Sequence, residues 1–495
     1  MALGGDAVRA TVWALVQNVG GRALSFVVFI LLARLLDADS FGTVALATSA
    51  MMVCLVLLEA GCAEALVQRE HVTDDHINSV FWATLAISVV LAAAVCLVSG
   101  IVAGIFSVPL LAPILTMLAL TLPFAAISNV LAAALRRDLQ FRTLAIRTFA
   151  VNIVSAAVGI GMAIRGMGVW SLVGKIVTEY VVSVLVLWLA TRWRPTLRIS
   201  RESAREVAPF GLNFVCSRIA QLLSNTADKW IAGYFLGTHA LGLYNTAQRV
   251  FSLPQDLLPA AASNVLMPTL SRLQADPERA RRALLKTIGS VTLLGYPVFG
   301  MLVLLMPDLV LAVLGPAWSG AILPAQILCA GGVVFSVTYL MPSVWLSQGR
   351  ASWHFRYTLA NGIANVTGFM IGVWWGPAGL ALAYVVRGVF FTFPLSVYLV
   401  HRASGCAPRE VLGALGLSLR SAVAMVVVTV AAATLLPADI HTLARIVILL
   451  LAGMLSFVGA LALFARGELR TLVDDFCSAF PSARRFFPAL LQKGT

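Results

Sequence analysis

Three apolar stretches of the sequence, near residues 12–36, 208–236 and 241–267, carry side chains that are unfavourable to bury in hydrocarbon. A charged group there costs at least about 2.5–3.5 kcal/mol on insertion scales, so its presence needs a functional or structural reason. Within each stretch the polar residues recur at helical spacing, which places them on one face of a helix. The polar stripes consist of Asn18, Arg22 and Ser25 in the first stretch, Asn213, Ser217, Arg218, Gln221, Ser224, Asn225, Asp228 and Lys229 in the second, and Asn245, Gln248, Arg249, Ser252, Gln255 and Asp256 in the third. We expect such stripes to face a water-filled cavity or another helix rather than lipid.

The arginines of these stripes indicate what a cavity would bind. The guanidinium groups of Arg22, Arg218 and Arg249 suit a phosphate, so a cavity that they line predicts an anionic substrate. The alternative is that the stripes are hydrogen-bonding contacts between helices. That alternative accounts equally well for the Asn, Gln and Ser members, but less well for arginine, which is more unfavourable to bury. Asp228 beside Lys229 is explained equally well as a neutralised pair.

Several charges outside the three stripes also fall in apolar segments. Arg387 is a further candidate for the cavity, although a lone arginine can also reach the membrane interface with its long side chain. Lys175 and Glu179 stand four residues apart on one predicted helix, and we expect them to form an ion pair. Glu59 approaches the end of its apolar segment and is explained either as an ion or proton site or as an interfacial residue.

The composition identifies the environment of these helices. Of the 495 residues, 60% are hydrophobic and 12% are charged, and the mean hydropathy is +0.92. A water-soluble domain carries about 25% charged residues, so this chain lacks roughly half of the usual polar surface. The net charge of +13 does not indicate nucleic-acid binding, because the basic residues lie in short loops between apolar runs. The sequence therefore predicts an all-α integral membrane protein.

Apolar runs of about 20 residues, the length needed to cross a bilayer, recur along the whole chain. One of these runs, residues 357–375, contains Gly368 and Gly372 four residues apart, and we expect this glycine pair to let the helix pack closely on a neighbour. The fourteen predicted spans are residues 12–36, 42–66, 79–106, 109–134, 143–164, 169–190, 208–236, 241–267, 287–314, 320–347, 357–375, 378–400, 412–436 and 442–465.

The distribution of basic residues supports this set of spans. With the termini and every second loop on one side, that side carries 24 Lys and Arg, the other loops carry only Arg165, and ten lie inside spans, of 35 in all. Cytoplasmic loops are the basic ones, so both termini are predicted to be cytoplasmic.

Three short patterns occur twice in the same order. Residues 36–42 (LDADSFG) match residues 236–242 (LGTHALG), Phe141-Arg142 recurs as Phe355-Arg356, and residues 166–169 recur as 376–379. Helices 1–6 thus correspond to helices 7–12 as a parallel repeat, and such repeats hold a substrate site at their interface. The predicted domains are an N-lobe at 1–190, a cytoplasmic linker at 191–207, a C-lobe at 208–400, helices 13 and 14 at 401–465, and a cytoplasmic tail at 466–495.

No motif of an enzyme or of a cofactor site is present. The sequence has no Walker A loop, no H-E-x-x-H and no G-x-S-x-G. The seven cysteines are scattered, without a C-x-x-C pair, and indicate neither a disulfide framework nor a zinc site. We expect a transporter without a cofactor or a bound metal.

Three segments resemble one family of transporters. Residues 33–47 (ARLLDADSFGTVALA) and residues 228–247 (DKWIAGYFLGTHALGLYNTA) are similar to the end of helix 1 with the start of helix 2, and to their repeat, in bacterial polysaccharide flippases. Residues 135–142 (LRRDLQFR) resemble the loop before helix 5 in the colanic-acid Wzx-like branch. With the helix plan of six, six and two, the chain is identified as a member of the Wzx-type polysaccharide transporters of the multidrug/oligosaccharidyl-lipid/polysaccharide exporter superfamily.

The resemblance implies two six-helix lobes around a central cavity in the bacterial cytoplasmic membrane. It implies a flippase that moves undecaprenyl-pyrophosphate-linked oligosaccharide to the outer leaflet by alternating access, for exopolysaccharide, O-antigen or capsule synthesis. Arg22, Arg218 and Arg249 would neutralise the pyrophosphate, and Asp228, Asp256 and Glu59 would be the candidates for coupling transport to an ion. Its other partners would be membrane lipids and the polymerase and glycosyltransferases of the pathway, and not nucleic acid. The side chains expected to bind sugar hydroxyls are Asn18, Gln221, Asn225, Asn245 and Gln248.

Three alternatives share the helix plan or the membrane setting. A lipid II flippase of the MurJ type also has a cationic cavity, but the loop motifs here resemble the Wzx branch. A multidrug exporter of the superfamily takes cationic drugs and needs acidic side chains in its cavity, whereas this cavity is predicted to be basic. A scramblase-like or assembly protein would transport nothing by itself.

Overall fold

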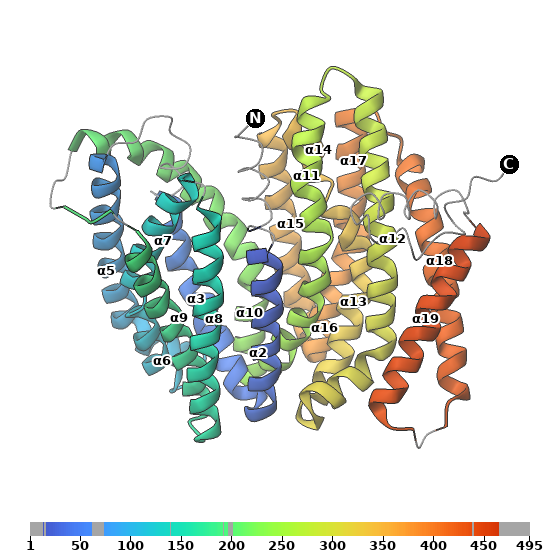
Figure 1. Ribbon diagram of the computed structural model, residues 1–495, viewed down its shortest axis with the longest axis horizontal. Helices are drawn as coiled ribbons and strands as arrows, with labels where there is room; N and C mark the ends of the chain where they lie inside the picture. Colours follow the sequence, from blue (N-terminus) through green and yellow to red (C-terminus); the bar gives the residue numbers. More distant parts are fainter. Residues whose placement is uncertain are drawn as a thin grey trace. The chain divides into compact units, whose positions relative to one another are not determined.

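A computed structural model describes residues 13, 16–61, 74–138, 140–191, 193–196, 201–437 and 440–464. For residues 59–61, 74, 76 and 201–225 it describes the backbone and not the side chains. All regular elements in these ranges are helices, which confirms the predicted all-α class (Figure 1). The predicted tail at 466–495 lies outside the described residues.

The chain forms two compact units. Unit 1 comprises Met1–Arg249, Val313–Pro324 and Phe355–Tyr384, and unit 2 comprises Val250–Ala312, Ala325–His354 and Val385–Thr495.

Unit 1 begins with a single π-helical turn, η1 (Val16–Gly20), which continues into α2. Its helices pack as a bundle in which α8 contacts both α2 and α9, and α7 contacts α5 and α9. The predicted span 109–134 consists of two helices, because the chain turns at Leu120–Thr121 and Pro123 begins the second. The helices are α2 (Gly21–Leu35), α3 (Ala38–Gly61), α5 (Asp74–Ile105), α6 (Leu111–Ala119), α7 (Leu122–Arg137), α8 (Phe141–Ile164), α9 (Val169–Ala190) and most of α10 (Arg201–Leu257).

Helix α10 contains a sharp break at Gly237, whose φ of 80° is a conformation that favours glycine. The break separates the predicted spans 208–236 and 241–267. The second of these spans is itself interrupted, because α10 ends at Leu257 and a new helix starts at Pro259. Proline lacks a backbone N–H and is favoured at the first turn of a helix, so Pro259 divides the predicted span 241–267 into two helical segments.

Unit 2 packs α12 against α11, α18 and α19, and α14 against α11 and α17. Its apolar core between α12, α18 and α19 contains Tyr296, Leu305 and Met425. Helices α13, α15 and α16 each contain residues that are assigned to both units. The helices of this part of the chain are α11 (Pro259–Arg272), α12 (Pro277–Leu309), α13 (Ile322–Thr338), α14 (Pro342–Ser347), α15 (Ala351–Gly372), α16 (Gly376–Arg387), α17 (Phe393–Ser404), α18 (Pro408–Leu435) and α19 (Thr442–Phe464).

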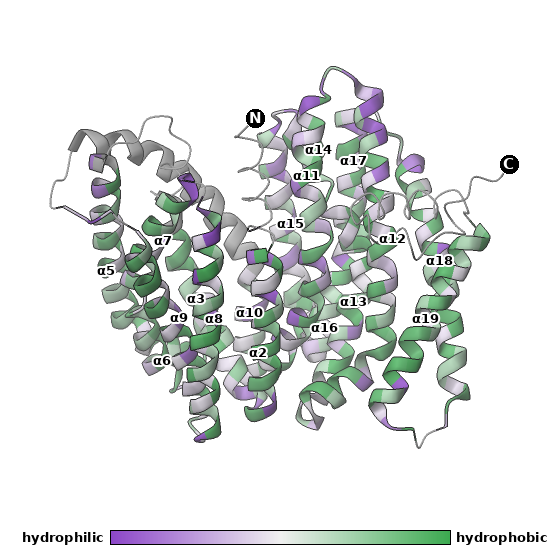
Figure 2. Ribbon diagram, in the orientation of Figure 1, coloured by the Kyte–Doolittle hydropathy of each residue, from purple (hydrophilic) through white to green (hydrophobic). Residues whose placement is uncertain are grey.

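Hydrophobic residues predominate along most of these helices (Figure 2), and many large apolar side chains are exposed. Leu97, Leu189 and Leu463 are 82%, 84% and 79% exposed, a pattern that suits contact with lipid and not with water. Eleven helical stretches of the described residues are long and apolar enough to span a bilayer.

The eleven stretches confirm a multi-pass membrane protein, while the count of fourteen stays a prediction. One stretch, Ala351–Ser404, is 54 residues long and contains two predicted spans, 357–375 and 378–400. Helices α10 and α11, which hold the two most polar predicted spans, are not among the eleven.

Candidate functional site

Arg249 lies on the second half of α10 and contacts α2. Its Nη2 donates a hydrogen bond to Ser25 Oγ at 3.2 Å, and its guanidinium lies 4.6 Å from the centre of the Phe29 ring. Ser25 and Phe29 are four residues apart and share one face of α2. Two of the three predicted polar stripes therefore meet at Arg249, in a half-buried position within unit 1.

The predicted phosphate-binding residue Arg22 stands three residues before Ser25, on the same face of α2. Arg22 and Asn18 are exposed on the surface of unit 1. On α9, Lys175 Nζ and Glu179 Oε1 form the expected ion pair, and the charge of Glu179 acts on Arg249. The site on α2, α9 and α10 thus combines cations with a single paired carboxylate among these residues, so it can attract an anion.

Next to this site, a buried polar network connects the two halves of α10. The carboxyl group of Asp228 is 3% exposed and accepts a hydrogen bond from Gln248 Nε2 and from the backbone N–H of Lys229 at 2.9 Å. Gln248 Nε2 also donates to the Tyr244 hydroxyl at 3.1 Å. The side chain of Asp228 is therefore held by the amide of Gln248, which lies on the other side of the break at Gly237. Lys229 contributes its backbone N–H to this network.

The two copies of the first repeated pattern, residues 36–42 and 236–242, lie against each other in unit 1. A Cβ atom on Gly42 would lie 1.8 Å from the carbonyl oxygen of Thr238, and one on Gly242 would lie 1.9 Å from that of Ala38. Asp39 accepts a hydrogen bond from Thr238 Oγ1 at 2.7 Å, and its other oxygen lies 3.1 Å from His239 Nδ1. Only glycine permits this backbone approach, so the crossing depends on both glycines.

The remaining predicted site residues are distributed over both units. Arg387 and Asp256 belong to unit 2, where Arg387 Nη1 donates to Thr392 Oγ1 at 2.7 Å. Asn245 and Lys229 are half-buried on α10. The side chains of Arg218, Gln221, Asn225 and Glu59 lie outside the described residues.

Three residues that make tertiary contacts in unit 1 had no assigned role in the sequence prediction, and two of them belong to the contacts described above. Phe29 provides the ring beneath Arg249, and Tyr244 is fully buried beside Gln248. Arg147 on α8 donates from Nε to Ser183 Oγ at 2.7 Å. The four-residue spacing of Ser25 with Phe29 and of Tyr244 with Gln248 is a signal for the first two, whereas Ser183 is on another helix and gives no local signal for Arg147.

Comparison with known proteins places this geometry in a wider context. Residues 31–323 match the model of a family described as polysaccharide biosynthesis protein. The chain is 28% identical over 310 residues to the succinoglycan biosynthesis transport protein ExoT of Rhizobium meliloti (strain 1021). The aligned part is 62% of this chain and 63% of ExoT, so it spans less than two thirds of the length of ExoT. It is 22% identical to the lipopolysaccharide biosynthesis protein WzxC of Escherichia coli (strain K12), over 83% of this chain and 84% of WzxC.

Solved structures share the fold. The lipid II flippase MurJ in an inward closed conformation superposes with a TM-score of 0.75 at 14% identity, over 93% of this chain and 100% of that chain. An inward-facing multidrug resistance MATE family transporter of the MOP superfamily gives a TM-score of 0.64 at 15% identity, over 78% of this chain and 95% of that one. At these identities the likeness shows the helical architecture alone.

Proposed function

The chain belongs to the family of polysaccharide biosynthesis proteins, and from this premise we propose that it is a flippase for lipid-linked oligosaccharides. Its substrate would be an oligosaccharide repeat unit on undecaprenyl pyrophosphate, moved from the inner to the outer leaflet of the bacterial cytoplasmic membrane. The relatives named for succinoglycan transport and for lipopolysaccharide biosynthesis support this substrate class. They also support a transporter rather than an enzyme.

The observation that carries the proposal is the placement of Arg249 between Ser25 and Phe29, on the face of α2 that also holds Arg22. Two guanidinium groups on facing helices of a membrane bundle suit a diphosphate, because each can present parallel donors to phosphate oxygens. The amides of Asn18 and Asn245 would donate hydrogen bonds to sugar hydroxyls and accept hydrogen bonds from them, and Gln248, whose Nε2 already donates to Asp228 and Tyr244, would accept through its Oε1. The hydrocarbon tail of the substrate would stay in the bilayer.

The transport cycle would follow alternating access between two states of the protein. The buried Asp228, held by Gln248, is the best-supported site for coupling to an ion. Polymerase and glycosyltransferases of the same pathway are the expected partners, and both termini are expected on the cytoplasmic side.

The test replaces Arg249 with alanine in a strain that depends on this protein for its polymer. We expect export of the polymer to fall about tenfold or more, because a charge-assisted hydrogen bond is worth about 1.5–3 kcal/mol. The matched control is Arg165→Ala, because Arg165 is exposed at the end of α8 and makes none of the contacts described for Arg249. Both variants must reach the membrane in equal amounts by immunoblot.

The outcome separates the proposal from its alternatives. Wild-type export by Arg249→Ala would remove the arginine from substrate binding. Lysis on depletion would assign the protein to lipid II transport, and drug sensitivity with intact polymer would assign it to drug export.

A further inference from the structure

Unit 2 contains a cavity of about 420 Å³ among the ends of α11, α12, α14 and α17. This volume falls within the range of about 300–1,000 Å³ that is usual for ligand pockets. All of its lining residues belong to unit 2, and Arg22 and Arg249 belong to unit 1. The cavity is therefore built from residues other than those of the proposed site for the transported substrate.

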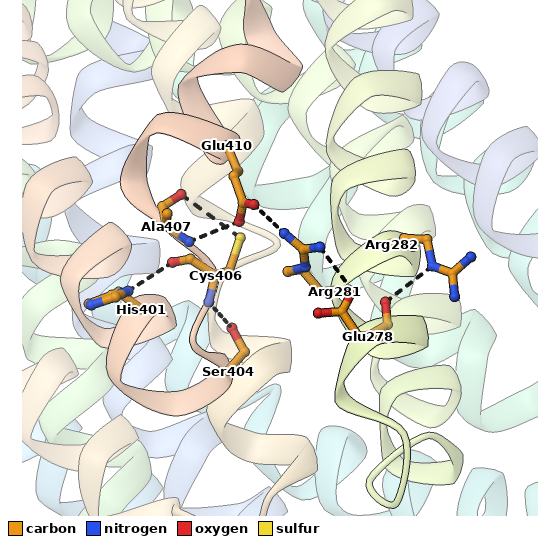
Figure 3. A network of polar contacts seen from close by, with 8 residues as sticks. All are labelled: Glu278, Arg281, Arg282, His401, Ser404, Cys406, Ala407 and Glu410. Atoms are coloured by element: carbon orange, nitrogen blue, oxygen red, sulfur yellow. Dashed lines mark hydrogen bonds and ion pairs between the residues drawn. The ribbon is translucent and has the colours of Figure 1, made fainter.

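Polar contacts hold the walls of this cavity in place. Gln274 Nε2 donates to the carbonyl oxygen of Ser347, and Gln348 Nε2 donates to that of Ala403 at 2.9 Å. Arg281 donates to Glu410 on α18, and to Glu278 at 2.9 Å (Figure 3). These bonds tie the turn between α11 and α12, the end of α14, the end of α17 and the start of α18 to one another, so the cavity is preformed.

The lining is amphipathic. Leu270, Leu273, Leu284 and Val344 form an apolar part, while Arg281 and Arg350 contribute cationic groups. The two terminal nitrogens of Arg281 are already engaged by carboxylates. Arg350 forms no ion pair with a carboxylate in the part of the chain that the structure describes, and its guanidinium lies 4.5 Å from the centre of the Trp353 ring. Arg350 is thus the cation available to a ligand in the cavity.

The helix ends and turns around the cavity carry more basic than acidic residues. Residues 268–286, 348–356 and 401–411 contain the acidic residues Asp276, Glu278 and Glu410 and the basic residues Arg272, Arg279, Arg281, Arg282, Lys286, Arg350, Arg356, Arg402 and Arg409. Hydrophilic residues gather at the matching ends of α11 and α12 (Figure 2). Basic pockets between helices at the cytoplasmic side of a membrane protein are suited to anionic lipid head groups.

We propose that this cavity binds the phosphate head group of an anionic phospholipid of the inner leaflet. Arg350 neutralises the phosphate, the polar groups of Ser347 and Gln348 lie beside it, and the leucines contact the glycerol and the first carbons of the acyl chains. The lipid would be a bound component of unit 2 and not the transported substrate. The proposal uses the expected cytoplasmic position of these helix ends and turns and does not depend on the flippase activity.

The experiment measures lipid retention by the purified full chain with native mass spectrometry, during titration with phosphatidylglycerol or with phosphatidylethanolamine. We expect wild-type protein to retain phosphatidylglycerol preferentially. Arg350→Ala should weaken retention about fivefold, since one arginine near an anionic surface contributes about 1 kcal/mol. Arg409→Ala is the matched control, because Arg409 is exposed in the first turn of α18 and does not line the cavity.

A second variant separates the cavity from charge effects. Ala403→Phe fills part of the cavity and leaves every arginine in place, so it should also reduce retention of phosphatidylglycerol. Equal retention of the two lipids by wild-type protein, or equal losses in Arg350→Ala and Arg409→Ala, would overturn the proposal. Displacement of phosphatidylglycerol by inorganic phosphate at equal concentration would assign the cavity to a soluble phosphate and overturn the lipid as its occupant.

Discussion

Two arginines in this chain make contacts of different kinds. Arg249 in unit 1 lies against the hydroxyl of Ser25 and the ring of Phe29. Arg281 in unit 2 lies between the carboxylates of Glu278 and Glu410. Both are half-buried, and both fall in or beside predicted membrane helices.

The two sets of contacts give the arginine side chain two different roles. Two carboxylates hold Arg281 in one place and connect α12 to α18, which is a structural contact. A hydroxyl and an aromatic ring contact Arg249, and neither carries a negative charge of its own. The residue type is the same in the two cases, but two carboxylates mark Arg281 as a structural group, and Arg249 stays the candidate for ligand binding.

The largest effect is expected for the rate of thiol alkylation, which should differ between a cysteine placed beside Arg249 and the native Cys406 near Arg281. Burial and the neighbouring Glu410 raise the pKa of Cys406 to about 11, so at pH 8 its thiolate fraction is roughly 100-fold below that of an ordinary thiol. A cysteine in place of Ser25 would stand beside the Arg249 cation, which favours the reactive thiolate. Site-resolved mass spectrometry should find alkylation of Ser25→Cys at least about 100-fold faster than that of Cys406.

Raising the pH provides the control for this comparison. The native state holds the Cys406 proton more tightly than the unfolded state does, so the resulting stabilisation is present below about pH 9 and is lost as the pH rises toward about 11. Labelling of Cys406 should rise about tenfold per pH unit below its pKa. Equally slow labelling of Ser25→Cys would show that the surroundings of Arg249 are closed to water.

A smaller effect is expected when each arginine is replaced by lysine. Arg249→Lys keeps the charge but loses the planar pair of donors that suits a phosphate, and we expect export to fall about tenfold. Arg281→Lys still offers an ammonium group to two carboxylates, and export should stay within about twofold of wild type. Export per amount of protein in the membrane is the measurement. Equal losses in both variants would erase the distinction between the two arginines.

The smallest effect concerns stability. Arg281→Ala and Glu410→Ala should each lower the midpoint of thermal unfolding by about 2–4 °C, and the double variant should lower it by less than the sum. Glu410 also accepts from the backbone N–H of Ala407 at 2.9 Å at the start of α18, so its loss should be the larger. Additive shifts would show that the two residues do not interact in the membrane-inserted protein.

Much of the helical plan follows from composition and spacing alone. The ion pair of Lys175 with Glu179 is confirmed, as is the close approach at Gly372, where a Cβ would lie 2.5 Å from the carbonyl oxygen of Gly379. Both depend on regular helical geometry, in which residues three and four apart share a face. Arg249 was predicted from its charge in an apolar stretch, and its meeting with the stripe of α2 followed from no local pattern.

The features that sequence reasoning missed are tertiary. The cavity of unit 2 depends on Gln274 and Gln348 reaching backbone carbonyls of other helices, and any residue has such a carbonyl. The interruption between Leu257 and Pro259 is, by contrast, a local feature, because a proline within an apolar run disrupts the helix and can be read from the sequence. Hydropathy indicates which segments enter the membrane, and it does not specify which neighbouring helix each face will meet.

The crossing of Gly42 and Gly242 limits how the surrounding helices can move. Each glycine lies directly against a carbonyl of the other segment, so a shift by one residue along either chain would bring a side chain, such as that of Phe41 or Leu241, into the space of a hydrogen atom. Sliding is therefore blocked, whereas pivoting about the contact point leaves the spacing intact. A structural change at this end of unit 1 must rotate around the crossing or separate it completely, and small translations will not occur there.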